Sequence, residues 1–531
     1  TSHPSNHHKP LLRPHAFIPQ PMIPGRHLAR RGAFLVIKTR KRGKFVQYLC
    51  SDEGGRKTRT GEGVDDVLQR KSERIKRKLQ EKEVPSTSFA RMVGFGGMAA
   101  KVAMQSMFSG KSSDGSSGGG DRKSDQAAAP GGWMSDAVAD TIASELCRMR
   151  GAALKVGQIL SLQDSQNLPK PLAKALERVR TEANIMPKWQ LHQVMTSNLG
   201  PSWREKFSEF NEEPVAAASI GQVHRGRTLE GSDIAIKVQY PGVAHGIDAD
   251  MANLQRLLSL GSFVPKGLFL DRVIATAKEE LKLECDYLRE AENQSRFRTL
   301  LTESSGDNTT FSDAISVPRV HTDLTTSEIL TSDWVEGDPV DSLTNDSGEW
   351  ATQEVRDSVA SRLLQLVIRE LFDFRLVQSD PNWSNFLYDK SADILHLIDF
   401  GAVNEYPEEF VTNYLKLVKA CADKDKAKIL RLSKQIGFLN GKESPTMIQA
   451  HLEAAYIMGE PFANEEPFDF SKFKHGERMA EQGTVFLNER LVPPPKEVYT
   501  LHRKLFGAIS TCVKLRAKVP CRKYLNAFLD S

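Results

Sequence analysis

The sequence predicts an α+β fold of two lobes, preceded by a helical extension. Three observations lead to this prediction. Residues 214–240 follow the order strand, tight loop, strand, turn, strand, which is typical of a small β-rich lobe. Residues 133–210 instead show apolar residues at steps of three and four, which indicates helices. Residues 378–403 carry polar groups on both sides of an apolar run, within a second lobe expected over residues 336–531.

The chemistry of that polar segment centres on Asp380, Asn385 and Asp399. Asn385 follows Asp380 by five residues, and an apolar run then leads to an Asp-Phe-Gly triplet that begins at Asp399. In protein-kinase-like folds a loop aspartate orients the acceptor hydroxyl, while an amide five residues on and the aspartate of D-F-G bind Mg²⁺. The spacing therefore predicts a kinase-like cleft that takes ATP and Mg²⁺, with ILHLIDF as a strand of a short hairpin. Two surface loops with ordinary turn residues are the alternative.

Residues 213–335 are expected to form the smaller lobe, which binds the nucleotide. Ile-Ala-Ile-Lys places Lys237 on a strand, as in the kinase motif whose lysine holds the α- and β-phosphates. This lysine needs an acidic partner, and the helical stretch KEELKLECDYLREAEN offers Glu284, Asp286 and Glu290. An exposed charged helix would have a similar composition, so these carboxylates are informative only beside Lys237.

Two backbone segments are expected to hold the phosphates and the base of the nucleotide. The phosphate loop has alanine where kinases use glycine, and comprises Ala216, Ala217, Ala218 and Ser219. Each alanine adds a Cβ, which confines the backbone to negative φ and fills space near the phosphates, so we expect a stiffer loop. The hinge, whose backbone groups are expected to contact adenine, comprises Ser332, Asp333, Trp334 and Val335.

The first 51 residues differ in charge from the rest of the chain. Residues 1–51 hold ten Lys or Arg and no acid, which leaves 62 basic and 67 acidic residues, a net charge of −5, for the remainder. A basic, acid-free segment resembles an organelle transit peptide, and a disordered basic tail is the alternative. The mildly acidic remainder argues against nucleic acid as a partner. Six cysteines without C-x-x-C spacing indicate a reducing compartment and no zinc cluster.

Two linkers flank a candidate membrane segment. Residues 52–88 form a charged linker, and residues 109–132 form a linker rich in Gly and Ser. Residues 89–108 are long enough to cross a bilayer. Arg91 and Lys101 argue against a span, because a charge near mid-bilayer costs roughly 2.5–3.5 kcal/mol. An interfacial helix and a short core or linker helix are the alternatives.

Four motifs occur in an order that resembles the UbiB family of atypical kinases, also called aarF-domain-containing kinases. They are K-V-G-Q in the helical extension (residues 133–212), P-V-A-A-A-S-I-G-Q-V-H, E-C-D-Y-L-R-E-A and Q-S-D-P-N-W-S-N-F. The resemblance extends from about Phe89 to the C-terminus, and the branch it is most similar to is the mitochondrial one required for coenzyme Q (ubiquinone) biosynthesis. It implies a protein-kinase-like two-lobed fold with an added N-terminal helical extension carrying K-x-G-Q.

The resemblance also implies roles for individual residues. The family's catalytic residues correspond to Lys237, Glu290 and Asp380. Its metal ligands correspond to Asn385 and Asp399, and its alanine-rich loop and hinge to the segments given above. Its regulatory K-x-G-Q and E-x-D motifs correspond to Lys155, Gln158, Glu284 and Asp286. In the family K-x-G-Q folds over the site where a protein substrate would bind, so we expect Lys155 to meet Glu284 or Asp286.

The function implied is that of an atypical kinase or ATPase that binds Mg-ATP and supports coenzyme Q biosynthesis at a membrane, by ATP-driven handling of lipid precursors or of the biosynthetic complex. A protein or small-molecule kinase of that pathway and a nucleotide-binding scaffold without turnover are the alternatives. The joint presence of Lys237, Asp380, Asn385 and Asp399 argues against the scaffold. Expected partners are coenzyme Q biosynthesis proteins, membrane lipids or quinone precursors, and a second copy in a homodimer, at the mitochondrial inner membrane facing the matrix.

Overall fold

A computed structural model describes residues 79–81, 151–152, 155, 183–259, 270–303, 314–344, 351–380 and 382–529. Several sequence predictions lie outside these residues, namely the transit segment, the candidate membrane segment, the Gly- and Ser-rich linker and Gln158. Within the described ranges, no helix is both long enough and apolar enough to span a bilayer.

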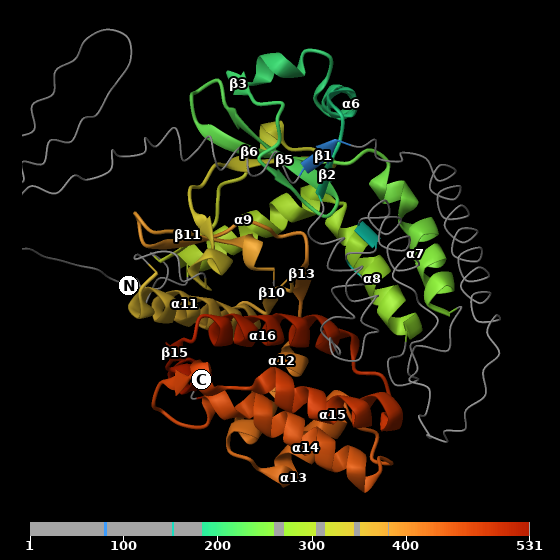
Figure 1. Cartoon of the computed structure of the whole chain (residues 1–531), viewed down its shortest axis with the longest axis vertical. Coiled ribbons are helices and arrows are strands. Elements are labelled where there is room, and N and C mark those ends of the chain that lie inside the picture. Colours follow the sequence, from blue (N-terminus) through green and yellow to red (C-terminus); the bar gives the residue numbers. More distant parts are fainter. Residues whose placement is uncertain are drawn as a thin grey trace, which may run out of the picture. The chain divides into compact units, whose positions relative to one another are not determined.

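The smaller lobe is an antiparallel sheet in the order β3-β5-β6-β8, with β4 added alongside β5 (Figure 1). Its strands are β3 (Glu209–Phe210), β4 (Ala216–Ala217), β5 (Gly221–Arg227), β6 (Asp233–Gln239) and β8 (Ile329–Asp333). The predicted strand pattern of residues 214–240 is confirmed by β4, β5 and β6. β5 and β6 pair along their whole length across a turn in which Gly231 has φ +91°.

Strand periodicity decides which way the side chains of β6 point. Ile234, Ile236 and Val238 are fully buried in one cluster with α6 (Lys188–Leu199), to which Met195 contributes. Because successive side chains of a strand alternate between faces, Lys237 lies on the opposite face of the sheet. That face carries the candidate active site.

Residues 133–212 are predicted to form the helical extension, but the last part of this range packs with the smaller lobe. Residues 183–210 were expected to be helical, but they contain strand β2 (Ala183–Ile185), which pairs in parallel with β1 (Leu79–Glu81), and also strand β3. Trp203, Phe207 and α6 pack into the same cluster as the sheet of the smaller lobe. Helical periodicity is present in α6, but periodicity does not tell which neighbour a helix packs against.

Three helices join β6 to the rest of the chain: α7 (Val243–Ser259), α8 (Leu270–Glu284) and α9 (Tyr287–Glu303). The acidic stretch predicted as helical is thus broken at Cys285 and Asp286. The Asp286 carboxylate accepts a hydrogen bond from the Arg289 N–H at 3.1 Å, which satisfies one of the unpaired donors at the start of α9. α9 passes beneath the sheet and carries Glu290 into the cleft (Figure 1).

The larger lobe contains a small sheet and most of the described helices. The sheet has the order β7-β12-β11-β9, with β7 (Ile315–Ser316), β12 (Ile394–Leu397), β11 (Phe386–Asp389) and β9 (Asp338–Pro339). Two further pairs are β10 (Leu376–Gln378) with β13 (Val403–Glu405), and β14 (Phe468–Asp469) with β15 (Lys518–Val519). The lobes therefore meet between β8 and β9, close to the predicted boundary after Val335.

The helices of this lobe are α11 (Gln353–Phe372), α12 (Glu408–Ala422), α13 (Lys426–Ile436), α14 (Pro445–Gly459), α15 (His475–Glu489), α16 (Lys496–Lys514) and α17 (Cys521–Asn526). Local signals set their ends: the Ser444 hydroxyl accepts the Met447 N–H at 3.0 Å, and Pro445 follows in the first turn of α14. The main core joins α11, the small sheet and α16, and includes Phe400. In Figure 1, α16 lies beside α11.

Candidate active site

Lys237 meets two carboxylates in the cleft between the lobes. Its Nζ lies 2.7 Å and 3.0 Å from the two oxygens of Glu290 on α9, and 3.4 Å from Oδ2 of Asp399. Burial alone would lower the pKa of Lys237, but the charges of Asp399 and Glu290 outweigh it and raise that pKa well above its ordinary value. The ammonium is therefore charged and held in place. Of the three carboxylates predicted as partners, the fold selects Glu290.

An aromatic ring and a glycine shape the floor of this site. The Lys237 ammonium lies 5.1 Å from the ring centroid of the fully buried Tyr287. A Cβ at Gly221 would lie 2.5 Å from the Val238 carbonyl oxygen and 2.8 Å from the Tyr287 hydroxyl, so this position accepts only glycine. Gly221 and Tyr287 both lie in motifs quoted from the sequence, but their contact with each other became visible only in the fold.

The alanine loop is shorter than predicted, because Ala216 and Ala217 belong to β4. The turn that follows is closed by the Ala218 N–H, which donates to the Gly221 carbonyl at 2.8 Å. Residues with positive φ occur elsewhere in the described chain, but none of the three alanines is among them. This agrees with a loop confined to negative φ. Ser219 lies in the lining of the cavity beside Lys237.

The catalytic loop brings Asp380 and Asn385 together. Asn385 ends a short 3₁₀ turn, η6 (Trp383–Asn385), and its side-chain amide donates to Oδ2 of Asp380 at 3.1 Å. The other oxygen of Asp380 accepts the Asn382 N–H at 3.1 Å. The Ile398 N–H donates to the Asn385 carbonyl at 3.1 Å, which sets Asp399 beside the loop. The predicted hairpin, formed by β11 and β12, is confirmed.

The Asp-Phe-Gly triplet is fixed from below by α9. Phe400 is fully buried, and its ring centroid lies 5.2 Å from that of Phe297. Arg289 donates to the carbonyls of Gly401 and Val403. Burial would raise the pKa of Asp399, but Lys237 and the Gly401 N–H lower it below its ordinary value. Asp399 is therefore ionised, as a ligand of a divalent cation must be.

Lys155 enters the cleft from the extension and meets Glu284, as predicted. Its side chain is only 3% exposed, and Nζ contacts a carboxylate oxygen of Glu284 and lies 2.9 Å from Glu280. Burial lowers the pKa of Lys155, but the charges of Glu284 and Glu280 produce a net rise. Asp286, the other predicted partner, instead bonds the start of α9. Glu284 ends α8, whereas Asp286 lies in the break before α9, so the E-x-D motif does not present both acids to one lysine.

Sequence reasoning missed two residues, Glu280 of α8 and Arg503 of α16, that connect the Asp380 loop to Lys155 of the extension. Arg503 of α16 is buried, and its guanidinium donates to Glu280 at 2.8 Å and to the carbonyl and hydroxyl oxygens of Ser379 at 3.1 and 3.0 Å. Glu280 thus bridges Arg503 and Lys155. Because Ser379 precedes Asp380, Arg503 fixes the first residues of the catalytic loop. No spacing rule connects groups so far apart in the sequence.

The predicted hinge joins β8 to the larger lobe. The N–H groups of Asp333 and Trp334 each donate to a backbone carbonyl of the smaller lobe at 2.9 Å. For Val335, no backbone hydrogen bond from its N–H to another described residue is present. Of these hinge N–H groups, the one that is open to an adenine edge is therefore that of Val335.

The groups in the cleft fit a magnesium-bound triphosphate, although the space between them is small. A cavity of about 30 Å³ lies among Lys155, Ser219, Lys237, Glu284, Asp380 and Asp399. Sites for drug-sized molecules measure about 300–1,000 Å³, so a nucleotide requires this cleft to open. Mg²⁺ usually takes only one or two carboxylates and completes its shell with water and phosphate oxygens, which suits Asp399 and Asn385.

These features define a class: a two-lobed α+β enzyme with the lysine–glutamate pair, Asp–Asn loop and Asp-Phe-Gly of the protein kinases. Comparison with known proteins gives the family. Residues 178–433 match the ABC1 atypical kinase-like domain. The chain is 41% identical over 480 residues to a zebrafish (Danio rerio) protein named mitochondrial atypical kinase COQ8B, covering 89% of this chain and 73% of the relative.

Two further comparisons agree. The chain is 38% identical to the mitochondrial atypical kinase COQ8 of Saccharomyces cerevisiae, covering 87% of this chain and 89% of the relative. A solved structure of Rv3197 from Mycobacterium tuberculosis, in complex with erythromycin, superposes with a TM-score of 0.50 at 26% identity, covering 73% of this chain and 95% of that one. The chain belongs to the ABC1 (UbiB) family of atypical kinases, as its motifs predicted.

Proposed function

We propose that this chain binds Mg²⁺-ATP in the cleft between the lobes and hydrolyses it. The observation that carries the proposal is the convergence of Lys237, Glu290, Asp380 and Asp399 on one small space, with Asn385 bonded to Asp380 beside it. Each of these groups has a partner that orients it, so the constellation is preorganised, which is what phosphoryl transfer chiefly requires of a protein.

Each residue has a role in this proposal. The Lys237 ammonium, fixed by Glu290 of α9, binds phosphate oxygens. Asn385 and Asp399 would hold Mg²⁺, and bound Mg²⁺ would supply the positive charge that neutralises the phosphates. The Asp380 carboxylate, oriented by the Asn382 N–H and the Asn385 amide, orients the attacking oxygen and accepts its proton.

Water is the favoured acceptor because the cleft has little room beside the nucleotide. Lys155 is buried between Glu280 and Glu284 at the place where a peptide would approach Asp380. Opening the cleft for a nucleotide does not by itself open it for a protein substrate. A protein or small-molecule kinase remains the alternative, and it predicts a labelled acceptor where hydrolysis predicts labelled phosphate.

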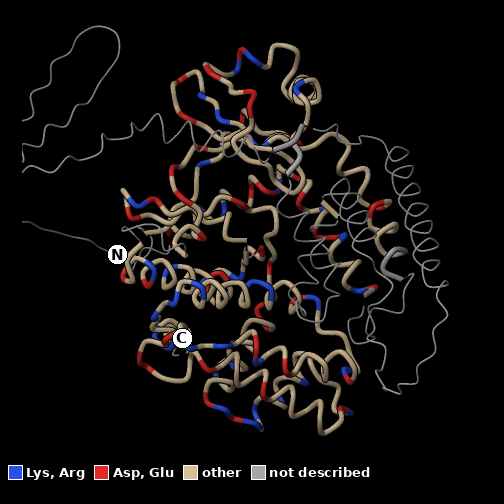
Figure 2. The backbone as a smooth tube through the Cα atoms, in the orientation of Figure 1, with Lys and Arg blue, Asp and Glu red and all other residues tan. Residues whose placement is uncertain are grey.

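The pathway is proposed from the relatives. Those most similar over most of the chain are named mitochondrial COQ8 or COQ8B atypical kinases. We therefore propose that ATP turnover here supports coenzyme Q biosynthesis in mitochondria, by handling lipid precursors or the biosynthetic complex at a membrane. Basic and acidic residues are interspersed along the described helices and strands (Figure 2), which supports a partner other than nucleic acid. The homodimer and the inner-membrane, matrix-facing location stay predictions.

Phosphate release from γ-labelled ATP tests the activity. Asp399→Asn is expected to abolish Mg²⁺-dependent release and the thermal stabilisation by Mg²⁺-ATP, because it removes the charge that attracts the ion. Asp393→Asn is the matched control: Asp393 lies in the same segment with φ +56°, which asparagine tolerates, and its partner is Arg362 at 2.7 Å, away from the cleft. Equal release from wild type and Asp399→Asn would refute the metal-site assignment.

Complementation tests the pathway separately. The chain, targeted to mitochondria, is expressed in a yeast strain that lacks its COQ8 relative, and coenzyme Q is measured. Wild type is expected to restore coenzyme Q and Asp399→Asn is not. If the purified chain hydrolyses ATP but leaves coenzyme Q unrestored, the activity stands and the pathway proposal fails.

A further inference from the structure

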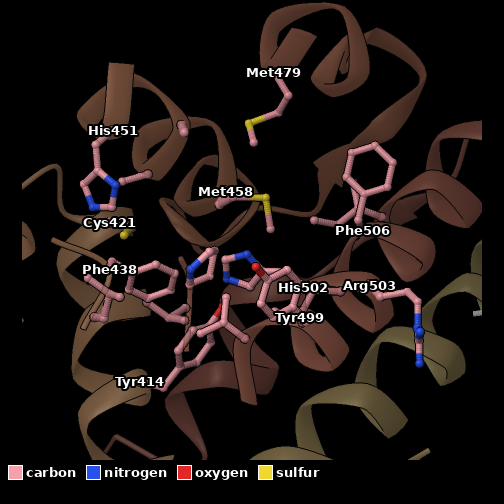
Figure 3. A pocket seen from close by; sticks show the side chains of 18 of the residues that line it. Tyr414, Cys421, Phe438, His451, Met458, Met479, Tyr499, His502, Arg503 and Phe506 are labelled. Atoms are coloured by element: carbon pink, nitrogen blue, oxygen red, sulfur yellow. The ribbon is translucent and has the colours of Figure 1, made fainter. Parts of the chain in front are cut away.

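A second cavity, much larger than the one at the catalytic residues, lies in the larger lobe among α12, α14, α15 and α16 (Figure 3). Its volume is about 380 Å³. A cavity of about 150 Å³ with apolar walls already holds benzene, and small-molecule sites span about 300–1,000 Å³. Close-packed interiors rarely keep such a space without a use.

The walls are mostly apolar, aromatic and sulfur-containing. Figure 3 shows side chains from several helices around one space, among them Tyr414, Phe438, Met458, Met479 and Phe506. Methionine side chains are flexible and adapt to chains of different shape. Such walls favour a long apolar group over a compact polar one.

The two histidines in the wall add no charge at neutral pH. Burial lowers the pKa of both His451 and His502 to about 4. His451 contacts the Ser433 hydroxyl at 2.8 Å, and His502 stacks on Phe438 with ring centroids 5.5 Å apart. Both rings therefore act as neutral parts of the wall.

One positive charge at the cavity lacks a carboxylate. Arg490, directly after α15, lies over the Phe486 ring at 4.8 Å, and no ion pair or hydrogen bond links its guanidinium to any other residue of the described chain. The nearby Tyr499 hydroxyl is buried and likewise has no hydrogen-bond partner there. Arg503 also lines the cavity, but Figure 3 shows its guanidinium turned away from the other labelled side chains, and it pairs with Glu280 at 2.8 Å.

A partly buried guanidinium without a carboxylate and a buried hydroxyl without a hydrogen-bond partner are costly unless a ligand satisfies them. We propose that this cavity binds a single-chain amphiphile with an anionic head group, a carboxylate or a phosphate monoester. The alkyl chain of the ligand lies against the aromatic and methionine walls, and its head group accepts hydrogen bonds from the Arg490 guanidinium and the Tyr499 hydroxyl. The proposal does not depend on ATP turnover or on the pathway.

Equilibrium dialysis of the full chain against radiolabelled myristate tests the site. Arg490→Gln is expected to weaken myristate binding at least tenfold, because a charge-assisted hydrogen bond to the head group is lost. Arg478→Gln is the matched control, since Arg478 lies on α15, outside the cavity lining, and pairs with Glu460 at 2.7 Å. It is expected to bind myristate as wild type does.

A second variant tests whether myristate occupies the volume of the cavity. Gly476 lines the cavity, and a Cβ added there meets no heavy atom within 4 Å. Gly476→Leu is expected to reduce myristate binding while Tm stays at or above the wild-type value, because glycine costs up to about 1 kcal/mol within a helix.

The head group is tested with analogues of equal chain length. 1-Tetradecanol is expected to bind more weakly than myristate and equally to wild type and Arg490→Gln, and comparison with tetradecyl phosphate shows which anion the site prefers. The proposal is overturned if wild type does not bind myristate, if both cavity variants bind it as well as wild type does, or if tetradecanol binds as tightly as the two anions.

Discussion

Arg503→Met should destabilise the protein through the buried ion cluster that supports the catalytic loop. Arg503 and Glu280 are 3% and 6% exposed, and the pair lies 2.8 Å apart. Removing one partner of a buried pair costs about 3–5 kcal/mol. Here Glu280 keeps Lys155 at 2.9 Å, so we expect about 3 kcal/mol, which corresponds to a fall in Tm on the order of 5 °C.

Arg503→Met should also lower the affinity of the site for Mg²⁺-ATP. Arg503 also holds both oxygens of Ser379, next to Asp380, so the thermal stabilisation by Mg²⁺-ATP should fall as well. Differential scanning fluorimetry with and without Mg²⁺-ATP measures both effects. Arg296→Met is the control, because the Arg296–Glu405 pair is 44% and 67% exposed and contributes under about 1 kcal/mol. If Arg503→Met lowers Tm no more than Arg296→Met, the buried cluster is not a support of the loop.

Three further predictions concern single side chains. Glu284→Gln removes one of the two acids that hold Lys155 over the cleft, so ATP affinity should rise several-fold in titrations. Asp286→Asn, which keeps the bond to the start of α9, should leave ATP affinity unchanged. Unchanged affinity in Glu284→Gln would contradict a role of the Lys155–Glu284 pair in closing the cleft. Ala218→Gly removes a Cβ and makes the loop more flexible, so it should shift the ATP-to-ADP affinity ratio and allow self-labelling by ATP. An unchanged ratio without label would refute it. The pKa of His502 is about 4 in the folded protein and about 6.5 in the unfolded chain. Between pH 6.5 and pH 4 the unfolded chain therefore binds a proton that the folded protein does not bind. The free energy of unfolding should fall as the pH drops from 6.5 to 4. His502→Phe keeps the stack on Phe438 and should reduce the dependence of the unfolding free energy on pH by up to about 1.4 kcal/mol per pH unit. Urea denaturation at several pH values measures this dependence. The same pH dependence in wild type and variant would show that His502 is not buried in its neutral form.

Much of the catalytic site could be predicted from the sequence because its parts are local. Asp380 and Asn385 share one short loop, and the β11–β12 hairpin returns Asp399 beside them. Residues so close in the sequence can adopt only a few relative positions, because backbone geometry allows few conformations in a short loop or hairpin. Lys237 followed from the Ile-Ala-Ile-Lys motif, and strand alternation decides the face on which its side chain lies.

The partners of these residues were decided only by tertiary packing. By composition and spacing the three acids near the start of α9 were equivalent, and the family resemblance was needed to assign Glu290 to Lys237. The break between α8 and α9 turns Glu290 to Lys237, Glu284 to Lys155, and Asp286 to its own helix end. Glu280 and Arg503 come from helices far apart in the chain, and the cavity beside Arg490 exists only where four helices meet. The physical reason is that the sequence of a helix determines which of its faces is apolar. Which neighbour that face packs against depends on how all the helices pack together.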